Sequence, residues 1–120
     1  MQFKNPLVTG GCGFIGSSLV RQLLPLSQTV NVVDNLSTGH ISNLSGISDN
    51  KLNVVKEDIR NELPMRKLIR SSDVIFHLAC LGVRHSIHSP IENNDVNANA
   101  TLQMLKISKE EKIERFVQVS

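Results

Sequence analysis

The sequence contains no tryptophan and no tyrosine, and only two of its 120 residues are cysteines. Cys12 and Cys80 lie far apart and lack metal-ligand spacing, so we expect reduced thiols and a cytoplasmic setting. No stretch approaches the length of a transmembrane helix, and the first residues lack the apolar run of a secretory signal. Thirteen basic and eleven acidic side chains form no run of like charge. Neither a nucleic acid nor a membrane is therefore expected as a partner.

What the sequence does contain is an alternation of short apolar runs with longer amphipathic ones. We expect a strand that ends at Thr9 and further strands at 29–34, 52–55, 73–79 and 115–120, with helices at 14–24, 61–70 and 89–109. Residues 35–50 are rich in Ser, Gly and Asn and are expected to form a loop with a short helical turn. Strands that alternate with helices predict one α/β domain, a doubly wound parallel sheet with helices on both faces.

The helix patterns also predict caps and buried faces. Ser89-Pro90-Ile91-Glu92 has Ser at the N-cap, Pro at the first helical position and Glu two residues later, which predicts a capping box. Pro25 should stop the first helix. From the helical spacing we expect the buried faces to hold Ile15, Leu19 and Leu23 in the first helix, and Ala98, Leu102 and Leu105 in the last.

The strongest local pattern is the glycine-rich segment 10–16. Gly10, Gly13 and Gly16 form G-x-x-G-x-x-G, and Gly11-x-Gly13-x-x-Gly16 also has the G-x-G-x-x-G spacing. Such glycines permit a tight turn, a close approach to a pyrophosphate and close helix packing. Because the segment follows a strand and opens a helix, it predicts a phosphate cradle. We therefore expect a Rossmann-like sheet with strand order 3-2-1-4-5.

Asp34 ends the second expected strand, eighteen residues after Gly16. A carboxylate at this point accepts hydrogen bonds from the hydroxyls of an adenosine ribose and repels a 2′-phosphate. No Lys or Arg occurs between Asp34 and Lys51 to neutralise such a phosphate, so NAD is predicted over NADP. A turn-forming role beside Asn35 is compatible with Asp34 but leaves its position at the strand end unexplained.

Two further segments follow expected strands. Asp58-Ile59 comes after the third strand and Leu78-Ala79-Cys80 after the fourth, and ligands bind at such carboxyl ends. Asp58 could contact an adenine amino group, or it could N-cap the helix that begins near Arg60; its position alone does not decide between the two.

Histidine and cysteine patterns do not indicate a metal site. His85 and His88 are three residues apart with no further ligand to complete a zinc set, so we expect both at the surface. His77 lies inside an apolar strand and is expected to be a hydrogen-bonded core residue. Cys12 stands at a helix N-terminus, where the pKa of a thiol can fall, although a role as a small loop residue is the favoured interpretation.

Together the motifs resemble the N-terminal part of the NAD-dependent epimerase/dehydratase family, the extended short-chain dehydrogenases that act on nucleotide sugars. Within that family they are most similar to UDP-glucose 4-epimerases. The resemblance covers essentially all 120 residues and rests on several segments in order: Thr9-Gly10-Gly11-Cys12-Gly13-Phe14-Ile15-Gly16, Asp34-Asn35-Leu36-Ser37-Thr38-Gly39, Asp58-Ile59-Arg60, His77-Leu78-Ala79 and Asn97-x-x-Ala100-Thr101-Leu102.

The resemblance implies a set of NAD contacts beyond the glycine loop. It implies that Phe14 and Ile15 lie against the pyrophosphate, that Asp34 and Asn35 hold the adenosine ribose, that Asp58 and Ile59 flank the adenine, and that Leu78, Ala79 and Cys80 line the path to the nicotinamide ribose. Asn97 matches the family's structural asparagine and is included in the cofactor site. Two departures are visible: Cys12 stands where Ala or Ser is commoner, and Ala100 replaces a usual Gly.

The resemblance also implies a longer protein. Family members continue after the fifth strand with a catalytic Ser or Thr, a Tyr-x-x-x-Lys motif and a sugar-nucleotide domain. Because this sequence has no Tyr, no catalytic residue is assigned, and Ser120 is expected just before the catalytic hydroxyl. We expect residues 1–120 to be the NAD-binding part of a nucleotide-sugar epimerase or dehydratase, homodimeric when complete. The alternatives are a non-catalytic module that senses NAD and a flavin-binding domain.

Overall fold

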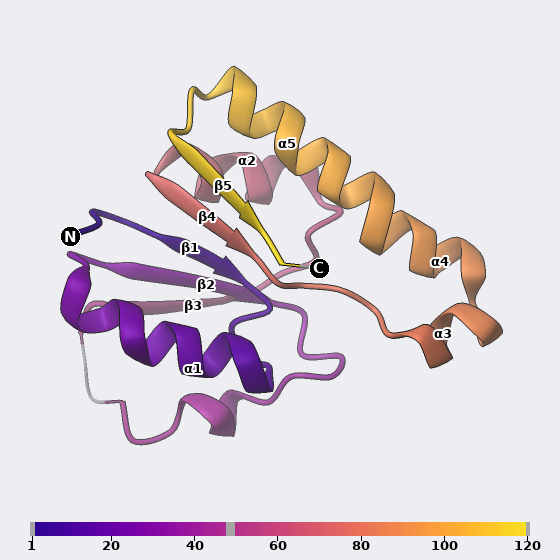
Figure 1. The fold of residues 1–120 in the computed structure, drawn as a ribbon, viewed down its shortest axis with the longest axis horizontal. Helices are drawn as coiled ribbons and strands as arrows, with labels where there is room; N and C mark the ends of the chain where they lie inside the picture. The colour runs from indigo at the N-terminus through magenta and orange to yellow at the C-terminus, as the bar shows by residue number, and fades with distance from the viewer. Residues whose placement is uncertain (1, 48–49, 120) are drawn as a thin grey trace.

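A five-stranded sheet with helices on both faces forms the centre of the computed structural model, which describes residues 2–47 and 50–119 (Figure 1). All the strand pairs are parallel and the order is β3-β2-β1-β4-β5. This confirms the doubly wound sheet and the predicted order. The strands are β1 (Leu7–Thr9), β2 (Val30–Asp34), β3 (Leu52–Lys56), β4 (Val74–His77) and β5 (Arg115–Gln118).

Helices connect successive strands, as a parallel sheet requires. Segments α4, η3 and α5 form one long helix, because the residues at both junctions keep right-handed helical angles, and η3 is a π-helical stretch within it. The helical segments are α1 (Phe14–Leu23), η1 (Leu24–Leu26), η2 (Ile41–Leu44), α2 (Glu62–Arg70), α3 (Val83–His88), α4 (Pro90–Asn94), η3 (Asp95–Asn99) and α5 (Ala100–Glu110).

The sheet divides the apolar core into two halves. Neighbouring residues of a strand point to opposite faces, so Leu7 packs with α2 and α5 while Val8 packs with α1. The half under α2 and α5 contains Leu7, Val33, Met65, Ile69, Ile75, Met104 and Ile107. The half under α1 contains Val8, Cys12, Val20, Leu23, Val30 and Val32. Central strands covered on both sides explain why their sequences are almost continuously apolar.

The predicted buried face of the long helix is wrong. Leu102 and Leu105 are 67% and 43% exposed, and Ala98 is also exposed. The residues that face the core are Val96, Ala100, Met104 and Ile107. This helix carries apolar residues at helical spacing on two faces, and contact with Met65 and Ile69 of α2 selects the second set.

The face of α1 and the cap of α4 also differ from the expectation. Of the predicted α1 residues only Leu23 is fully buried, and Ile15 is 66% exposed; the small residues Gly16 and Ser17 face the sheet instead. Ser89 is the N-cap of α4 and is followed by Pro90, but its side chain makes no capping bond. Glu92, the expected partner, bonds His85 instead, so the capping box does not form.

Candidate functional site

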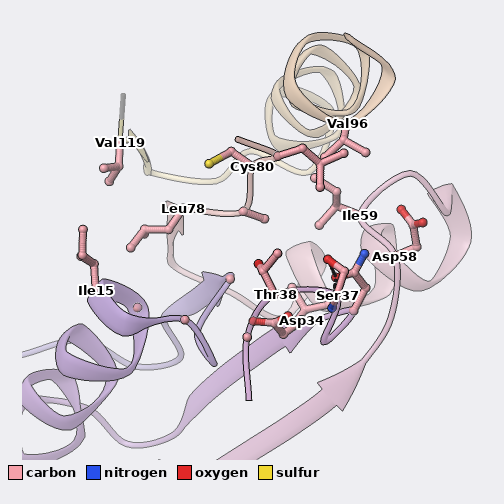
Figure 2. A pocket seen from close by; sticks show the side chains of 18 of the residues that line it. Ile15, Asp34, Ser37, Thr38, Asp58, Ile59, Leu78, Cys80, Val96 and Val119 are labelled. Carbon is pink, nitrogen blue, oxygen red and sulfur yellow. Dashed lines mark hydrogen bonds between the residues drawn. The ribbon is translucent and has the colours of Figure 1, made fainter. Parts of the chain in front are cut away.

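The carboxyl ends of the strands surround a cavity of about 410 Å³ (Figure 2). The segments after β1, β2, β3 and β4 all reach it. No Lys, Arg or His belongs to the described residues that line the cavity, whereas three of those residues are acidic. The lining consists of Gly10, Gly13, Phe14, Ile15, Gly16, Val33, Asp34, Asn35, Ser37, Thr38, Gly39, Glu57, Asp58, Ile59, Leu78, Ala79, Cys80, Leu81, Val96 and Val119.

The glycine turn between β1 and α1 forms one wall of the cavity. Gly10 has a φ of +71°, and a Cβ on Gly16 would lie 2.1 Å from the carbonyl oxygen of Gly10. Neither position therefore accommodates a side chain within the protein's own packing. A Cβ on Gly13 would meet only that same oxygen, at 3.3 Å. The protein's packing accordingly leaves space at Gly13, the N-cap of α1, where a helix presents its free N–H groups.

The Asp34 carboxylate joins two loops at the end of β2. Its Oδ2 accepts a hydrogen bond from the backbone N–H of Cys12 at 3.0 Å, and its Oδ1 accepts one from that of Leu36 at 2.8 Å. Leu36 has a φ of 63°, a left-handed conformation that costs a non-glycine residue about 1–3 kcal/mol and needs support from its surroundings. Asp34 supplies that support and still lines the cavity.

Acidic side chains after β3 form the wall opposite the glycine turn. Asp58 accepts two hydrogen bonds from the Arg60 guanidinium at Oδ2, at 3.1 and 2.6 Å, and one from the Arg60 backbone N–H at Oδ1, at 2.8 Å. Hydrogen bonding by Arg60 lowers the pKa of Asp58. The N-cap of α2 is Asn61, so the capping interpretation of Asp58 is wrong by position, since Asp58 closes the turn before the helix.

The segment from Leu78 to Leu81 forms a third wall and is held at both ends. At its start, the backbone N–H groups of Leu78 and Ala79 each donate to Thr9 Oγ1 at 3.0 Å. At its end, Asn97 Oδ1 accepts from the Leu81 N–H at 2.7 Å and Asn97 Nδ2 donates to the Leu81 carbonyl at 2.8 Å. Asn97 itself is not among the residues that line the cavity, and its side chain holds the Leu81 backbone instead.

His77 lies at the base of this segment and is 1% exposed. Its ring nitrogens are hydrogen-bonded to Thr9 Oγ1 at 2.6 Å and to Thr101 Oγ1 at 2.8 Å. Burial lowers the pKa of His77 to about 4, so the ring is neutral near pH 7. This confirms the prediction of a hydrogen-bonded core histidine.

The remaining candidates from the sequence are Cys12, His85 and His88. Cys12 is fully buried, and burial, assisted by the charge of Asp34, raises the pKa of its thiol. The alternative of a lowered pKa is therefore wrong. His88 is exposed and His85 is partly exposed in a pair with Glu92. Across residues 2–47 and 50–119, no group of three His, Cys, Asp or Glu side chains could hold a metal ion, and no helix there could cross a membrane.

The structure brings twelve of the thirteen predicted site residues to one cavity, all except Asn97. The predicted set did not include Ser37, Thr38 and Gly39, although they belong to the same motif as Asp34-Asn35. It also did not include Val33, Glu57 and Leu81, each of which adjoins a predicted residue or segment. Val96 and Val119 reach the cavity from the long helix and from beyond β5, and no local pattern marks them. Ser120, expected beside a catalytic hydroxyl, lies outside the described residues.

The family model described as GDP-mannose 4,6 dehydratase matches residues 7–120. A double mutant of the dTDP-glucose 4,6-dehydratase DesIV from Streptomyces venezuelae, solved with NAD bound, is 35% identical with a TM-score of 0.90, and the match covers 96% of this chain and 38% of the other. The UDP-glucose 4-epimerase of Thermotoga maritima, solved with UDP-glucose, is 32% identical with a TM-score of 0.85. The match covers 95% of this chain and 37% of the epimerase chain.

A curated relative with a third activity has a similar sequence identity to this chain. The UDP-N-acetyl-alpha-D-glucosaminuronate decarboxylase of Bacillus cytotoxicus is 34% identical over 104 residues, which are 86% of this chain and 32% of the relative. The chain thus spans about a third of the length of the proteins it matches. The sequence match and the structural similarity indicate the same family. The chain belongs to the GDP-mannose 4,6 dehydratase family of NAD-dependent epimerases and dehydratases.

Proposed function

We propose that this chain binds NAD in the cavity at the carboxyl ends of its strands. The observation that carries the proposal is the placement of the Asp34 carboxylate at the end of β2, where it contacts the glycine turn and lines a cavity whose described residues include three carboxylates and no basic side chain. A ribose with two free hydroxyls suits Asp34, whereas a 2′-phosphate would meet repulsion without a compensating cation.

The available space fits a dinucleotide at the point where its phosphates must approach the backbone. Gly13 leaves room in front of α1 that a Cβ would occupy, and the positive end of a helix dipole favours an anion there. Phe14 and Ile15 are 91% and 66% exposed at that entrance. Such exposure of large apolar side chains beside a cavity supports contact with a ligand.

The other proposed contacts come from the family resemblance, and the residues that it implies line the cavity. Asp34 and Asn35 would hold the adenosine ribose, Asp58 and Ile59 would flank the adenine, and the segment 78–80 would line the path to the nicotinamide. When bound, NAD supplies reversible acceptance of a hydride from a sugar carbon. The residues of this chain contribute binding and orientation, and none of them is assigned as acid or base.

We further propose that the whole protein modifies a nucleotide sugar, as an epimerase or a dehydratase, and that it is a homodimer. Relatives named as an epimerase, a dehydratase and a decarboxylase are similarly identical to this chain. The region that they share with it therefore supports the cofactor site and the substrate class but does not discriminate among the three reactions. A UDP-glucose 4-epimerase-like reaction is the one that we favour from the motifs.

Calorimetric titration of the purified chain with NAD, NADP and a flavin dinucleotide tests the cofactor proposal. We expect binding of NAD, weaker binding of NADP and none of the flavin. Tighter binding of the flavin would replace the proposal with the flavin-domain alternative. An assay of the complete protein tests the sensor alternative. A non-catalytic sensor would bind NAD but would convert no nucleotide sugar.

A further inference from the structure

His77 connects three elements that are distant in the sequence. It stands at the end of β4, in register with Thr9 at the end of β1, and it contacts Thr101 of α5. The ring is almost completely buried and packs against Phe116 of β5, with ring centroids 5.9 Å apart. A change in the direction of its two hydrogen bonds would therefore move the carboxyl ends of β1 and β4.

The donors and acceptors around the ring determine which of its nitrogens carries the proton. Thr9 Oγ1 accepts hydrogen bonds from the backbone N–H of Ala79 and from that of Leu78, which the Thr9 carbonyl shares. A hydroxyl has two lone pairs and one proton, so the remaining proton of Thr9 is donated to His77 Nδ1. The neutral ring then carries its own proton on Nε2 and donates it to Thr101 Oγ1 at 2.8 Å.

The chain of hydrogen bonds continues to the other end of the wall. Thr101 Oγ1 donates to the backbone carbonyl of Asn97 at 3.0 Å. The Asn97 side chain in turn holds both backbone groups of Leu81. The two sets of hydrogen bonds meet at Asn97, one at its backbone carbonyl and one at its side chain. Together they hold both ends of the wall segment 78–81.

The position of this wall matters because it lies directly against the glycine turn. A Cβ on Gly10 would lie 2.9 Å from the backbone nitrogen of Ala79, so the two walls are in contact at their base. Leu78, Ala79 and Cys80 line the cavity above that contact. A small displacement of the segment would change the width of the cavity between the segment and Ile15 (Figure 2).

We propose that His77, protonated on Nε2 and flanked by Thr9 and Thr101, is a positioning residue that sets the backbone of residues 78–81 for the cofactor. The proposal deepens the proposed NAD site and rests on it for the identity of the ligand. His77 is too deeply buried to reach a ligand itself, and it acts through the two threonines. The ring serves as a rigid link that accepts at one nitrogen and donates at the other.

The first test is spectroscopic and needs no ligand. Long-range proton–nitrogen correlation spectra of the chain, with the ring of His77 assigned by a His77→Gln variant, should show the neutral Nε2–H tautomer at near-neutral pH. A ring protonated on Nδ1, or on both nitrogens, would overturn the proposed order of hydrogen bonds.

The second test separates positioning from general stability with a matched pair at Thr101. Thr101→Val keeps the shape but leaves the Nε2–H without an acceptor, whereas Thr101→Ser keeps the hydroxyl. We expect the Val variant to bind NAD about tenfold more weakly and to exchange the amide protons of Leu78 and Ala79 faster, with Val32 of β2 as the reference. The Ser variant should restore both properties.

The outcomes distinguish this proposal from the cofactor assignment. If the unmodified chain binds no NAD but the Val variant still loosens the Leu78 and Ala79 amides, the NAD site is refuted and the positioning role is retained. If NAD binds equally to the Val and Ser variants and the amides of residues 78–79 do not respond, the positioning role is refuted while the NAD site stands.

Discussion

The carboxylate of Asp34 and the backbone N–H of Cys12 lie 3.0 Å apart and form a hydrogen bond between the loop after β2 and the glycine turn. A residue that the sequence predicts to recognise a ribose thus also holds the loop after β2 against the glycine turn. Gly39 lies against the same carboxylate, because a Cβ there would be 2.9 Å from Asp34 Oδ2. The proposed recognition of the ribose and the geometry of the glycine turn therefore depend on the same side chain.

Replacement of Asp34 by Ala should narrow the preference for NAD over NADP and also weaken NAD binding. The change removes the repulsion of a 2′-phosphate, but it leaves the N–H groups of Cys12 and Leu36 without their acceptor. The loss costs about 1–3 kcal/mol at the buried Cys12 and less at the partly buried Leu36. Calorimetric titration with both cofactors measures the two effects. Equal affinity for NAD and NADP in the unmodified chain would refute the role of Asp34 in selectivity.

Asp73 offers a matched control for this substitution. Its carboxylate also accepts two backbone hydrogen bonds, from Lys4 at 2.9 Å and Asn5 at 2.8 Å, but it precedes β4 and does not line the cavity. Asp73→Ala should therefore lower stability and leave the ratio of the NAD and NADP affinities unchanged. A shift in that ratio would indicate that the Asp34 effect is only a consequence of destabilisation.

The glycine turn allows ligand approach to be separated from folding. Gly13→Ala should change the free energy of unfolding by no more than about 1 kcal/mol, because the new Cβ meets only one atom, at 3.3 Å, but it should weaken NAD binding by about tenfold or more. Gly16→Ala should destabilise the fold by more than about 2 kcal/mol, since its Cβ would lie 2.1 Å from a backbone oxygen. Urea unfolding and calorimetry measure both variants; a Gly13→Ala variant that binds NAD normally would contradict the cradle.

The strand order and most of the residues that line the cavity could be predicted from the sequence, because both depend on local patterns. The apolar runs, the glycine turn and Asp34 specify strands and their carboxyl ends, and a doubly wound sheet then brings these ends together. The errors arose where long-range packing decides. Leu102 and Met104 are equally suitable for burial, and only contact with α2 places Met104 inside. Glu92 was assigned to its own helix cap, but His85, seven residues earlier, holds it instead.

The stability of the chain should fall as the pH is lowered from about 6.5 to about 4, because His77 is neutral in the folded state. Its pKa is about 4 when folded and about 6.5 when unfolded. The unfolded chain therefore binds the additional proton in this interval, and unfolding becomes more favourable as pH falls. Between about pH 7 and about pH 5 the expected loss is about 2 kcal/mol.

Urea unfolding at the two pH values, compared with a His77→Gln variant, measures this contribution. The variant should lose that part of the pH dependence, whereas His88→Gln, at an exposed position, is the matched control. A His77→Gln variant with the same pH dependence as the unmodified chain would mean that other groups account for it.

The 120 residues alone should bind NAD without converting a nucleotide sugar. The family resemblance assigns the general base to a Tyr, and the chain has none; a general acid or base contributes about 10²–10⁴-fold to a rate. Incubation of the purified chain with NAD and UDP-glucose, followed by chromatography of the sugar nucleotides, should give no UDP-galactose. Conversion above that of a mock preparation would contradict this assignment of the base.

The edge strand β5 should be the least protected part of the sheet. It pairs only with β4 among the described strands, and Val117 and Val119 are 38% and 45% exposed. An apolar edge with free backbone groups can pair with another chain. We therefore expect the amides of residues 116–119 to exchange much faster than those of residues 7–9, and the chain to self-associate in sedimentation experiments. Val117→Lys should reduce that association, because an edge lysine disfavours strand pairing, without changing exchange in β1. A monodisperse monomer in which residues 116–119 are as protected as β1 would refute the prediction.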